Sequence, residues 1–174
     1  MKCPAIRLPA LRATWWFALL LATCAAPPAV SAGELRPFDA KSYDEILRAH
    51  AGRAFVLAFW SIHCAPCKEE MVVFAALKRK HPHVPILLVA ADPPEAKADV
   101  VRFLEGQKLG KIELWVFADE FAERVRHSVD PKWRGELPRT YFFDAAHRLT
   151  ARSGVIDPDW VESWLAQAAP PKSK

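Results

Sequence analysis

The chain has 174 residues, of which 52% are hydrophobic and 25% are charged, and this balance predicts one globular domain and excludes a disordered or fibrous protein. Three of the 24 basic residues and none of the 20 acidic residues lie within residues 1–32, which leaves residues 33–174 with a formal charge of +1. A protein that binds nucleic acid needs a basic face. The near-neutral balance of residues 33–174 therefore excludes nucleic acid as a partner.

The N-terminal segment has the parts of a secretory signal peptide. Its basic residues precede a short apolar run at 15–22, and Val30 and Ala32 occupy the positions that require small side chains for cleavage after Ala32. The apolar run is about half as long as a spanning helix, which needs roughly 20 residues. We therefore predict that residues 1–32 are a signal peptide and that residues 33–174 form a domain exported to the periplasm.

Lipoprotein processing is the alternative for the same segment. Residues 21–24 are Leu-Ala-Thr-Cys, and cleavage before Cys24 would leave this cysteine acylated and the protein anchored to a membrane. Thr23 is a poor residue at the position just before such a cysteine. Lipidation is therefore the less favoured interpretation, and it leaves the prediction for the downstream domain unchanged.

The rest of the chain alternates between apolar runs and amphipathic segments. The runs at 54–60 and 85–91 are continuous, which is typical of strands buried on both faces. Ser42 and Asp119 are expected to cap helices, with Glu45 completing a capping box after Ser42. In chain order the predicted elements are an extended segment at 34–38, a helix at 42–48, a strand at 54–60, a helix at 68–80, a strand at 85–91, a helix ending at 106, a strand at 112–117, a helix from 119 to 129, strands at 139–143 and 148–152, and a helix after 157.

The order of these elements predicts how the strands pair. Strands that alternate with helices imply parallel strands with right-handed crossovers. The last two strands flank a four-residue turn and predict an antiparallel hairpin at the end of the sheet. The sequence thus predicts an α/β fold.

The Cys64-Ala65-Pro66-Cys67 segment lies where the buried strand ends and the next helix begins. The N-terminus of a helix presents free N–H groups and the positive end of its dipole, which lowers the pKa of the first thiol and favours the attacking thiolate. The second sulfur, one turn later, is close enough to resolve a mixed disulfide. The pattern therefore indicates thiol-disulfide exchange.

Metal binding and an inert buried pair are the alternative uses of these cysteines. A structural zinc site takes four ligands, but residues 33–174 contain no second cysteine pair, and none of the six histidines has a recognisable ligand spacing to this one. Haem attachment requires a histidine directly after the second cysteine, where Lys68 stands. We therefore expect no metal and no cofactor.

The segment 59–70, Phe-Trp-Ser-Ile-His-Cys-Ala-Pro-Cys-Lys-Glu-Glu, resembles the active-site segment of exported thiol-disulfide oxidoreductases of the TlpA/ResA type. The leader and the segment 137–144, Leu-Pro-Arg-Thr-Tyr-Phe-Phe-Asp, are similar to the same family. The resemblance implies a thioredoxin-like fold with a central mixed sheet flanked by helices. It also implies an extra helix-strand insertion between Ala91 and the terminal hairpin.

The resemblance also implies the roles of several residues. Cys64 corresponds to the nucleophile and Cys67 to the resolving thiol. Pro138 corresponds to a cis-proline that faces the pair, and it turns the Leu137 backbone toward a substrate strand. From the residues alone, Pro138 is also compatible with an ordinary trans turn before a strand. The implied partners are protein thiols or disulfides and a membrane or periplasmic redox donor.

Three positions depart from the family pattern. Ala58 stands where thioredoxins have a buried aspartate that handles the proton of the second thiol, and Glu70 is the candidate to replace it, although a solvated helix glutamate fits its spacing equally. His63 replaces a tryptophan; it either lowers the pKa of Cys64 and makes the couple more oxidising or is a plain surface residue. Val72 replaces a helix-kinking proline, which predicts a straighter helix.

We therefore predict a periplasmic oxidoreductase that acts on protein substrates through Cys64 and Cys67. The Ala-Pro dipeptide and the resemblance favour a reductase, whereas His63 leaves an oxidant or an isomerase open. A peroxiredoxin-like peroxide reductase is a second class, because Ser61 precedes Cys64 by three, although Leu57 stands where such an enzyme has a proline. A third class is a Cu(I) chaperone that uses both cysteines and a histidine, because thiolates select Cu(I).

Overall fold

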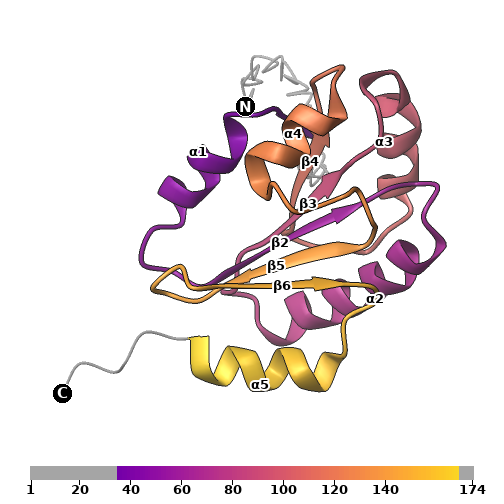
Figure 1. Cartoon of the computed structure of the whole chain (residues 1–174). Helices are drawn as coiled ribbons and strands as arrows, with labels where there is room; N and C mark the ends of the chain where they lie inside the picture. The colour runs from indigo at the N-terminus through magenta and orange to yellow at the C-terminus, as the bar shows by residue number, and fades with distance from the viewer. Residues whose placement is uncertain (1–34, 169–174) are drawn as a thin grey trace, which may run out of the picture. The chain divides into compact units, whose positions relative to one another are not determined.

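A computed structural model describes residues 35–168, which contain six strands, five α-helices and one short 3-10 helix (Figure 1). In chain order these are β1 Arg36–Phe38, α1 Ser42–Ala49, β2 Phe55–Trp60, α2 Ala65–Lys80, β3 Ile86–Ala90, η1 Pro94–Ala96, α3 Lys97–Glu105, β4 Glu113–Phe117, α4 Ala122–Val129, β5 Arg139–Phe143, β6 Leu149–Ser153 and α5 Pro158–Ala168. Each predicted strand and helix that falls within the described residues is present, with small shifts at the ends.

The six strands form one sheet in the order β1-β4-β3-β2-β5-β6. The neighbours β1, β4, β3 and β2 pair in parallel, whereas β5 pairs antiparallel with both β2 and β6. The helices α2 and α3 lie in the connections between the parallel neighbours, because such strands need a long crossover. The predicted mixed sheet and terminal hairpin are confirmed.

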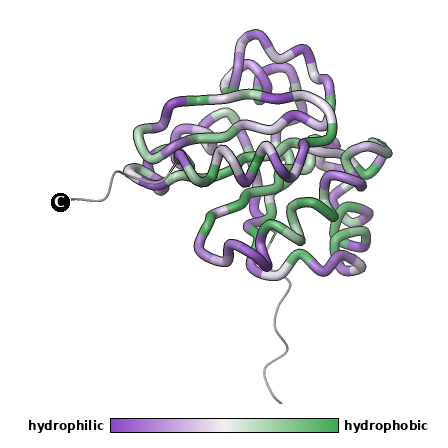
Figure 2. Tube along the Cα trace, turned by 90° about the horizontal axis from the view of Figure 1, so that it is seen from below, coloured by the Kyte–Doolittle hydropathy of each residue, from purple (hydrophilic) through white to green (hydrophobic). Residues whose placement is uncertain are grey.

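Two hydrophobic cores cover the two faces of the sheet. All six residues of β2 are buried, and they alternate between the cores, so that Ala58 lies in one core while Leu57 and Phe59 lie in the other. Helices α2, α3 and α5 supply the first core, and α1 and α4 supply the second (Figure 1). Figure 2 shows hydrophilic residues gathered in the outer loops, with hydrophobic residues mainly in the interior of the fold.

Helix α3 and strand β4 form the insertion expected between β3 and the terminal hairpin. Val100 and Leu104 of α3 pack into the first core, and β4 inserts between β3 and β1. The insertion thus extends the sheet on the parallel side, away from the hairpin of β5 and β6.

The start of α1 differs from the prediction. Asp39 supplies the acceptor there, because its carboxylate accepts the N–H groups of Lys41 at 2.8 Å and of Ser42 at 3.0 Å. The Ser42 hydroxyl donates to the same carboxylate at 3.0 Å. The expected capping box of Ser42 and Glu45 is therefore wrong: a stronger acceptor three residues earlier engages the serine side chain.

The starts of α4 and α2 are also shifted. Asp119 does not cap α4; its carboxylate accepts the N–H of Phe121 at 2.8 Å and pairs with Arg124 at 2.6 Å, while the helix itself begins at Ala122. Helix α2 begins at Ala65, earlier than the predicted start at 68, so the whole cysteine pair lies at its first turn.

The predicted signal peptide, the cleavage site after Ala32 and Cys24 lie outside the described residues. Within residues 35–168, none of the helices combines the length and the apolar character that crossing a bilayer requires.

Candidate active site

Cys64 lies at the junction between β2 and α2, where the chain changes from strand to helix. The N–H of Cys64 donates to the carbonyl of Ser61 at 3.1 Å, which closes a turn after β2. Cys64 is the N-cap residue of α2, and its sulfur accepts the N–H of Cys67 at 3.2 Å. The sulfur therefore lies against a free N–H group at the positive end of the helix, as the sequence predicts.

Cys64 and Cys67 form a disulfide, with 5.3 Å between their Cα atoms. The two cysteines differ in exposure. Cys64 is half-buried, whereas Cys67 is only 1% exposed and belongs to the core beneath α2. A molecule that approaches from solvent therefore meets Cys64 first.

Glu70 is buried under α2, three residues after Cys67. It is 1% exposed, whereas its neighbour Glu69 is exposed. The Thr140 hydroxyl on β5 donates to a carboxylate oxygen of Glu70 at 3.2 Å. Burial raises the pKa of Glu70 to about 7. The hydrogen bonds from Thr140 and from the Ile156 backbone lower the pKa, but by less than burial raises it. The alternative of a solvated helix glutamate is wrong, because the side chain is buried.

Ala58 and Glu70 are connected through Thr140 on β5. Ala58 is fully buried and pairs across β2 and β5 with Thr140, the residue that donates to Glu70. Cross-strand partners place their side chains side by side on one face. An aspartate at position 58 would lie on this face of the sheet. In this chain, the Glu70 carboxyl reaches the same face from α2.

His63 and Val72 are both exposed. The His63 backbone N–H donates to the Ser61 hydroxyl at 3.1 Å, so the turn fixes its main chain while its imidazole lies at the surface. An effect of His63 on the Cys64 thiol stays a prediction. Val72 is 67% exposed on α2, and the helix continues without a break from Ala65 to Lys80.

Asp92 is a site residue that no sequence motif indicated. It follows β3, is 2% exposed, and its carboxylate accepts the Ser61 hydroxyl at 2.7 Å and the Ile62 N–H at 3.2 Å. The signal that could have found it is its position: β2 and β3 are parallel neighbours, so residues that follow their carboxyl ends meet at one edge of the sheet. The Ser61 hydroxyl therefore donates a hydrogen bond to a buried carboxylate.

Leu137 and Pro138 lie in the loop that leads into β5, and the peptide bond between them is cis. Pro138 is buried, and its carbonyl accepts the N–H of Gly154 at 3.0 Å. Leu137 is half-buried and packs against both cores, including the core that Cys67 enters and that Cys64 packs against. The fold thus brings the loop before β5 to the core that supports the disulfide.

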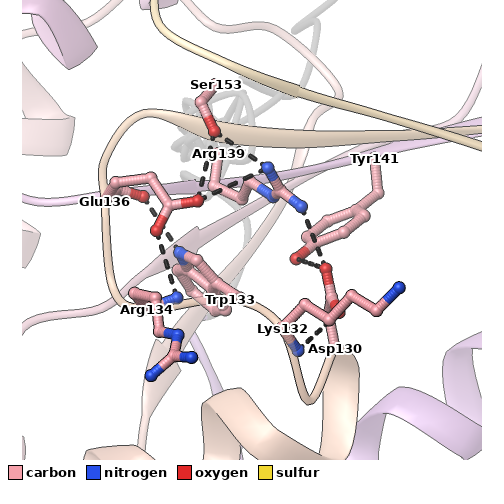
Figure 3. Close-up of polar contacts among 8 residues, drawn as sticks. All are labelled: Asp130, Lys132, Trp133, Arg134, Glu136, Arg139, Tyr141 and Ser153. Carbon is pink, nitrogen blue, oxygen red and sulfur yellow. Dashed lines mark hydrogen bonds and ion pairs between the residues drawn. The ribbon is translucent and has the colours of Figure 1, made fainter.

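A polar network braces this loop (Figure 3). Arg139 at its end pairs with Asp130 at its beginning at 2.9 Å, and the Tyr141 hydroxyl donates to the same carboxylate at 3.3 Å. The Trp133 indole N–H donates to the Glu136 carbonyl at 2.9 Å. The members of this network are spread through the loop and the start of β5 and follow no motif, so no sequence pattern indicates it.

No metal cluster accompanies the cysteines in the described part of the chain. Among residues 35–168, no group of three or more histidines, cysteines, aspartates or glutamates is placed to hold an ion.

Comparison with known proteins identifies solved structures with a similar fold. No family model matches the chain, and no curated protein matches it in sequence. Among solved structures, DsbF of Mycobacterium tuberculosis matches with a TM-score of 0.55 and 21% identity, over 70% of this chain and 85% of that one. The chain has a thioredoxin-like fold. The fold class expected from the sequence is thereby confirmed.

Two further matches carry the same thioredoxin-like fold. A thiol:disulfide interchange protein of the thioredoxin family from Chlorobium tepidum matches with a TM-score of 0.57 and 17% identity, over 70% of this chain and 83% of that one. The pneumococcal exposed lipoprotein thioredoxin from Streptococcus pneumoniae matches with a TM-score of 0.56 and 16% identity, over 70% of this chain and 89% of that one. In this thioredoxin-like chain, the Cys64–Cys67 disulfide lies at the carboxyl end of a central strand.

Proposed function

We propose that this chain is an exported thiol-disulfide oxidoreductase that acts on protein substrates as a reductase. One observation carries the proposal: Cys64 and Cys67 form a disulfide at the N-terminus of α2, with the half-buried Cys64 sulfur facing a helix N–H group. Such a sulfur is stabilised as a thiolate when it is reduced. The solved structures with this fold support the proposal, since they are named thiol:disulfide interchange proteins and disulfide oxidoreductases.

The reaction begins with the reduced pair. The Cys64 thiolate attacks one sulfur of a substrate disulfide, the substrate S–S bond breaks, and the other substrate sulfur leaves as a thiolate that takes up a proton. Cys67 then loses its proton and attacks the Cys64 sulfur. The second substrate thiolate leaves, and the Cys64–Cys67 disulfide forms. Two electrons pass from the enzyme dithiol to the substrate, and a redox donor in the membrane or periplasm returns them.

Glu70 accepts the proton of Cys67 in this scheme. The Cys67 thiol is buried, and burial disfavours its thiolate, so resolution needs a nearby base. Glu70 lies three residues later on the same helix and is buried, with a pKa of about 7. A carboxyl with this pKa exchanges protons with a thiol more readily near neutral pH than an ordinary glutamate does.

The substrate is seated by the loop before β5. Leu137 supplies backbone groups for an extended substrate segment, and the buried Pro138 fixes the direction of the chain at that point. The ion pair between Asp130 and Arg139 holds the two ends of the loop together. His63 is exposed beside Cys64 and forms part of the surface that the substrate meets.

Export is part of the proposal. Residues 1–32 have the pattern of a signal peptide, with cleavage after Ala32, and lipid attachment at Cys24 is the less favoured form. Similar solved structures include a secreted oxidoreductase and an exposed lipoprotein, which supports an exported location for this chain.

Two measurements test the proposal. Reduced protein should accelerate the reduction of insulin by dithiothreitol, and Cys64→Ser should abolish the acceleration. The Cys64–Cys67 couple, equilibrated with glutathione or dithiothreitol, should have a potential near that of thioredoxin, about −270 mV. A potential near that of the oxidant DsbA, about −120 mV, would contradict the reductase role. Absence of insulin reduction would contradict the oxidoreductase function itself.

A further inference from the structure

Asp92 is a buried carboxylate that is bonded to the turn leading into Cys64. It is 2% exposed, and it accepts the Ser61 hydroxyl at 2.7 Å and the Ile62 N–H at 3.2 Å. Asp92 is separated from both partners by about thirty positions in sequence and meets them because β3 lies beside β2. A carboxylate is costly to bury unless hydrogen bonds compensate for its lost hydration, so these two bonds are needed to hold it there.

Ser61 connects this carboxylate to the nucleophile. Its hydroxyl accepts the N–H of His63 at 3.1 Å, and its carbonyl accepts the N–H of Cys64 at 3.1 Å. Three consecutive N–H groups, of Ile62, His63 and Cys64, are therefore all bound by Asp92 or Ser61. The main chain from the end of β2 to the first residue of the pair is fixed by this set of bonds.

The position of the Cys64 sulfur depends on this turn. The sulfur accepts the N–H of Cys67 at 3.2 Å, and this contact with the helix N-terminus stabilises a thiolate. We propose that Asp92 and Ser61 are positioning residues that hold the turn so that the Cys64 sulfur stays on the N-terminus of α2. They thereby set the acidity of the Cys64 thiol and its rate of attack. The inference rests on the proposed oxidoreductase function, which it deepens.

The direction in which the pKa of the Cys64 thiol changes when Asp92 is replaced distinguishes a positioning role from a direct charge effect. If the Asp92 charge acted directly on Cys64, it would disfavour the thiolate, and its removal would lower the pKa of the Cys64 thiol. If Asp92 acts through the turn, its removal loosens the contact between the sulfur and the helix, and the pKa rises toward that of a free cysteine. Loss of the Ser61 hydroxyl then has the same effect, although it changes no charge.

The experiment measures alkylation of Cys64 by iodoacetamide in the reduced protein as a function of pH, with the modified residue identified by mass spectrometry. Ser61→Ala and Asp92→Asn are each expected to raise the pKa of the Cys64 thiol by about one unit, which slows alkylation at pH 6 about tenfold. Ser61→Thr keeps a hydroxyl and should restore wild-type behaviour. The flanking titratable residues His63, Lys68 and Glu70 are unchanged in all three variants.

A matched control is available at the start of α1. Ser42→Ala removes another bond between a serine hydroxyl and a carboxylate, the 3.0 Å contact with Asp39, and should leave alkylation unchanged. If Asp92→Asn does not fold, Ser61→Ala decides the test, since it alters no buried charge. Wild-type acidity in Ser61→Ala, or a lowered pKa in Asp92→Asn, overturns the proposal. Alkylation needs no disulfide exchange, so this result is independent of the insulin assay that tests the proposed function.

Discussion

The Thr140 hydroxyl donates a hydrogen bond to the Glu70 carboxyl at 3.2 Å, across the interface between β5 and α2. The two residues are 70 positions apart in the chain, and both are buried. Thr140 pairs with Ala58 on β2, so the acid reaches this face of the sheet from the helix and not from the strand. The contact fixes a titratable group beside the core that contains Cys67.

Glu70→Gln is expected to slow the resolution of mixed disulfides. The substitution keeps the size of the side chain and an oxygen for Thr140 but removes the base, so insulin reduction at pH 7 should fall on the order of tenfold to a hundredfold. In the wild type, resolution should accelerate as the pH rises through about 7, because Glu70 becomes ionised there. In the variant that step should disappear from the pH profile, while Cys64 remains as accessible to alkylation as before.

Glu69→Gln is the matched control for this prediction. Glu69 is exposed on the same helix turn, and Glu69→Gln makes the same chemical substitution. Its insulin activity and thiol titration should stay close to those of the wild type. Equal rates for the two variants would show that Glu70 has no role in proton transfer.

Glu70→Gln should also stabilise the folded protein at alkaline pH. Burial raises the pKa of Glu70 from 4.5 to about 7, so the folded state resists its ionisation, and Glu70 costs stability increasingly as the pH rises through this range. Glu70→Gln should therefore raise the free energy of unfolding at pH 8 by up to about 3 kcal/mol. At pH 4 the carboxyl is protonated in both states, and the gain should vanish. Urea denaturation of the oxidised protein at both pH values measures this, and a gain that is independent of pH would contradict it.

The two cysteines should behave asymmetrically when they are replaced one at a time. Cys67→Ser should accumulate mixed disulfides through the half-buried Cys64, because no second thiol releases the substrate. Cys64→Ser should be inert in exchange, since the remaining thiol is only 1% exposed. Non-reducing gel electrophoresis after incubation with a protein disulfide measures both. Equal trapping by the two variants would contradict the assignment of Cys64 as the nucleophile and Cys67 as the resolving thiol.

The processed protein is expected to begin at Gly33. Cleavage after Ala32 follows from the small residues that precede the cut and from the basic and apolar parts of the leader. The intact mass of protein isolated from its native host measures this directly. A chain that begins at an acylated Cys24, or one that retains Met1, would contradict the prediction.

The helix boundaries show how far local pattern determines structure. The apolar run of β2 and the cysteines that follow it located the strand-to-helix junction at the cysteine pair, because burial on both faces is a feature of neighbouring residues. The helix itself begins at Ala65, three residues before the predicted start. The cap of α1 was assigned to Ser42, but the Asp39 carboxylate three residues earlier binds both the main chain and the serine hydroxyl. Two acceptors were available in sequence, and the stronger one determined the geometry.

The sequence by itself determined the order of strands and helices and the position of the disulfide at a helix N-terminus, because these depend on periodicity and on residues adjacent in the chain. Only the tertiary structure decided the environments of Glu70 and Asp92. The spacing of Glu70 from Cys67 is equally compatible with a solvated and a buried carboxyl, and the packing of β5 against α2 buries it. Asp92 reaches Ser61 only because two strands lie side by side. Burial and long-range hydrogen bonds depend on which elements meet in space, and no local pattern contains that information.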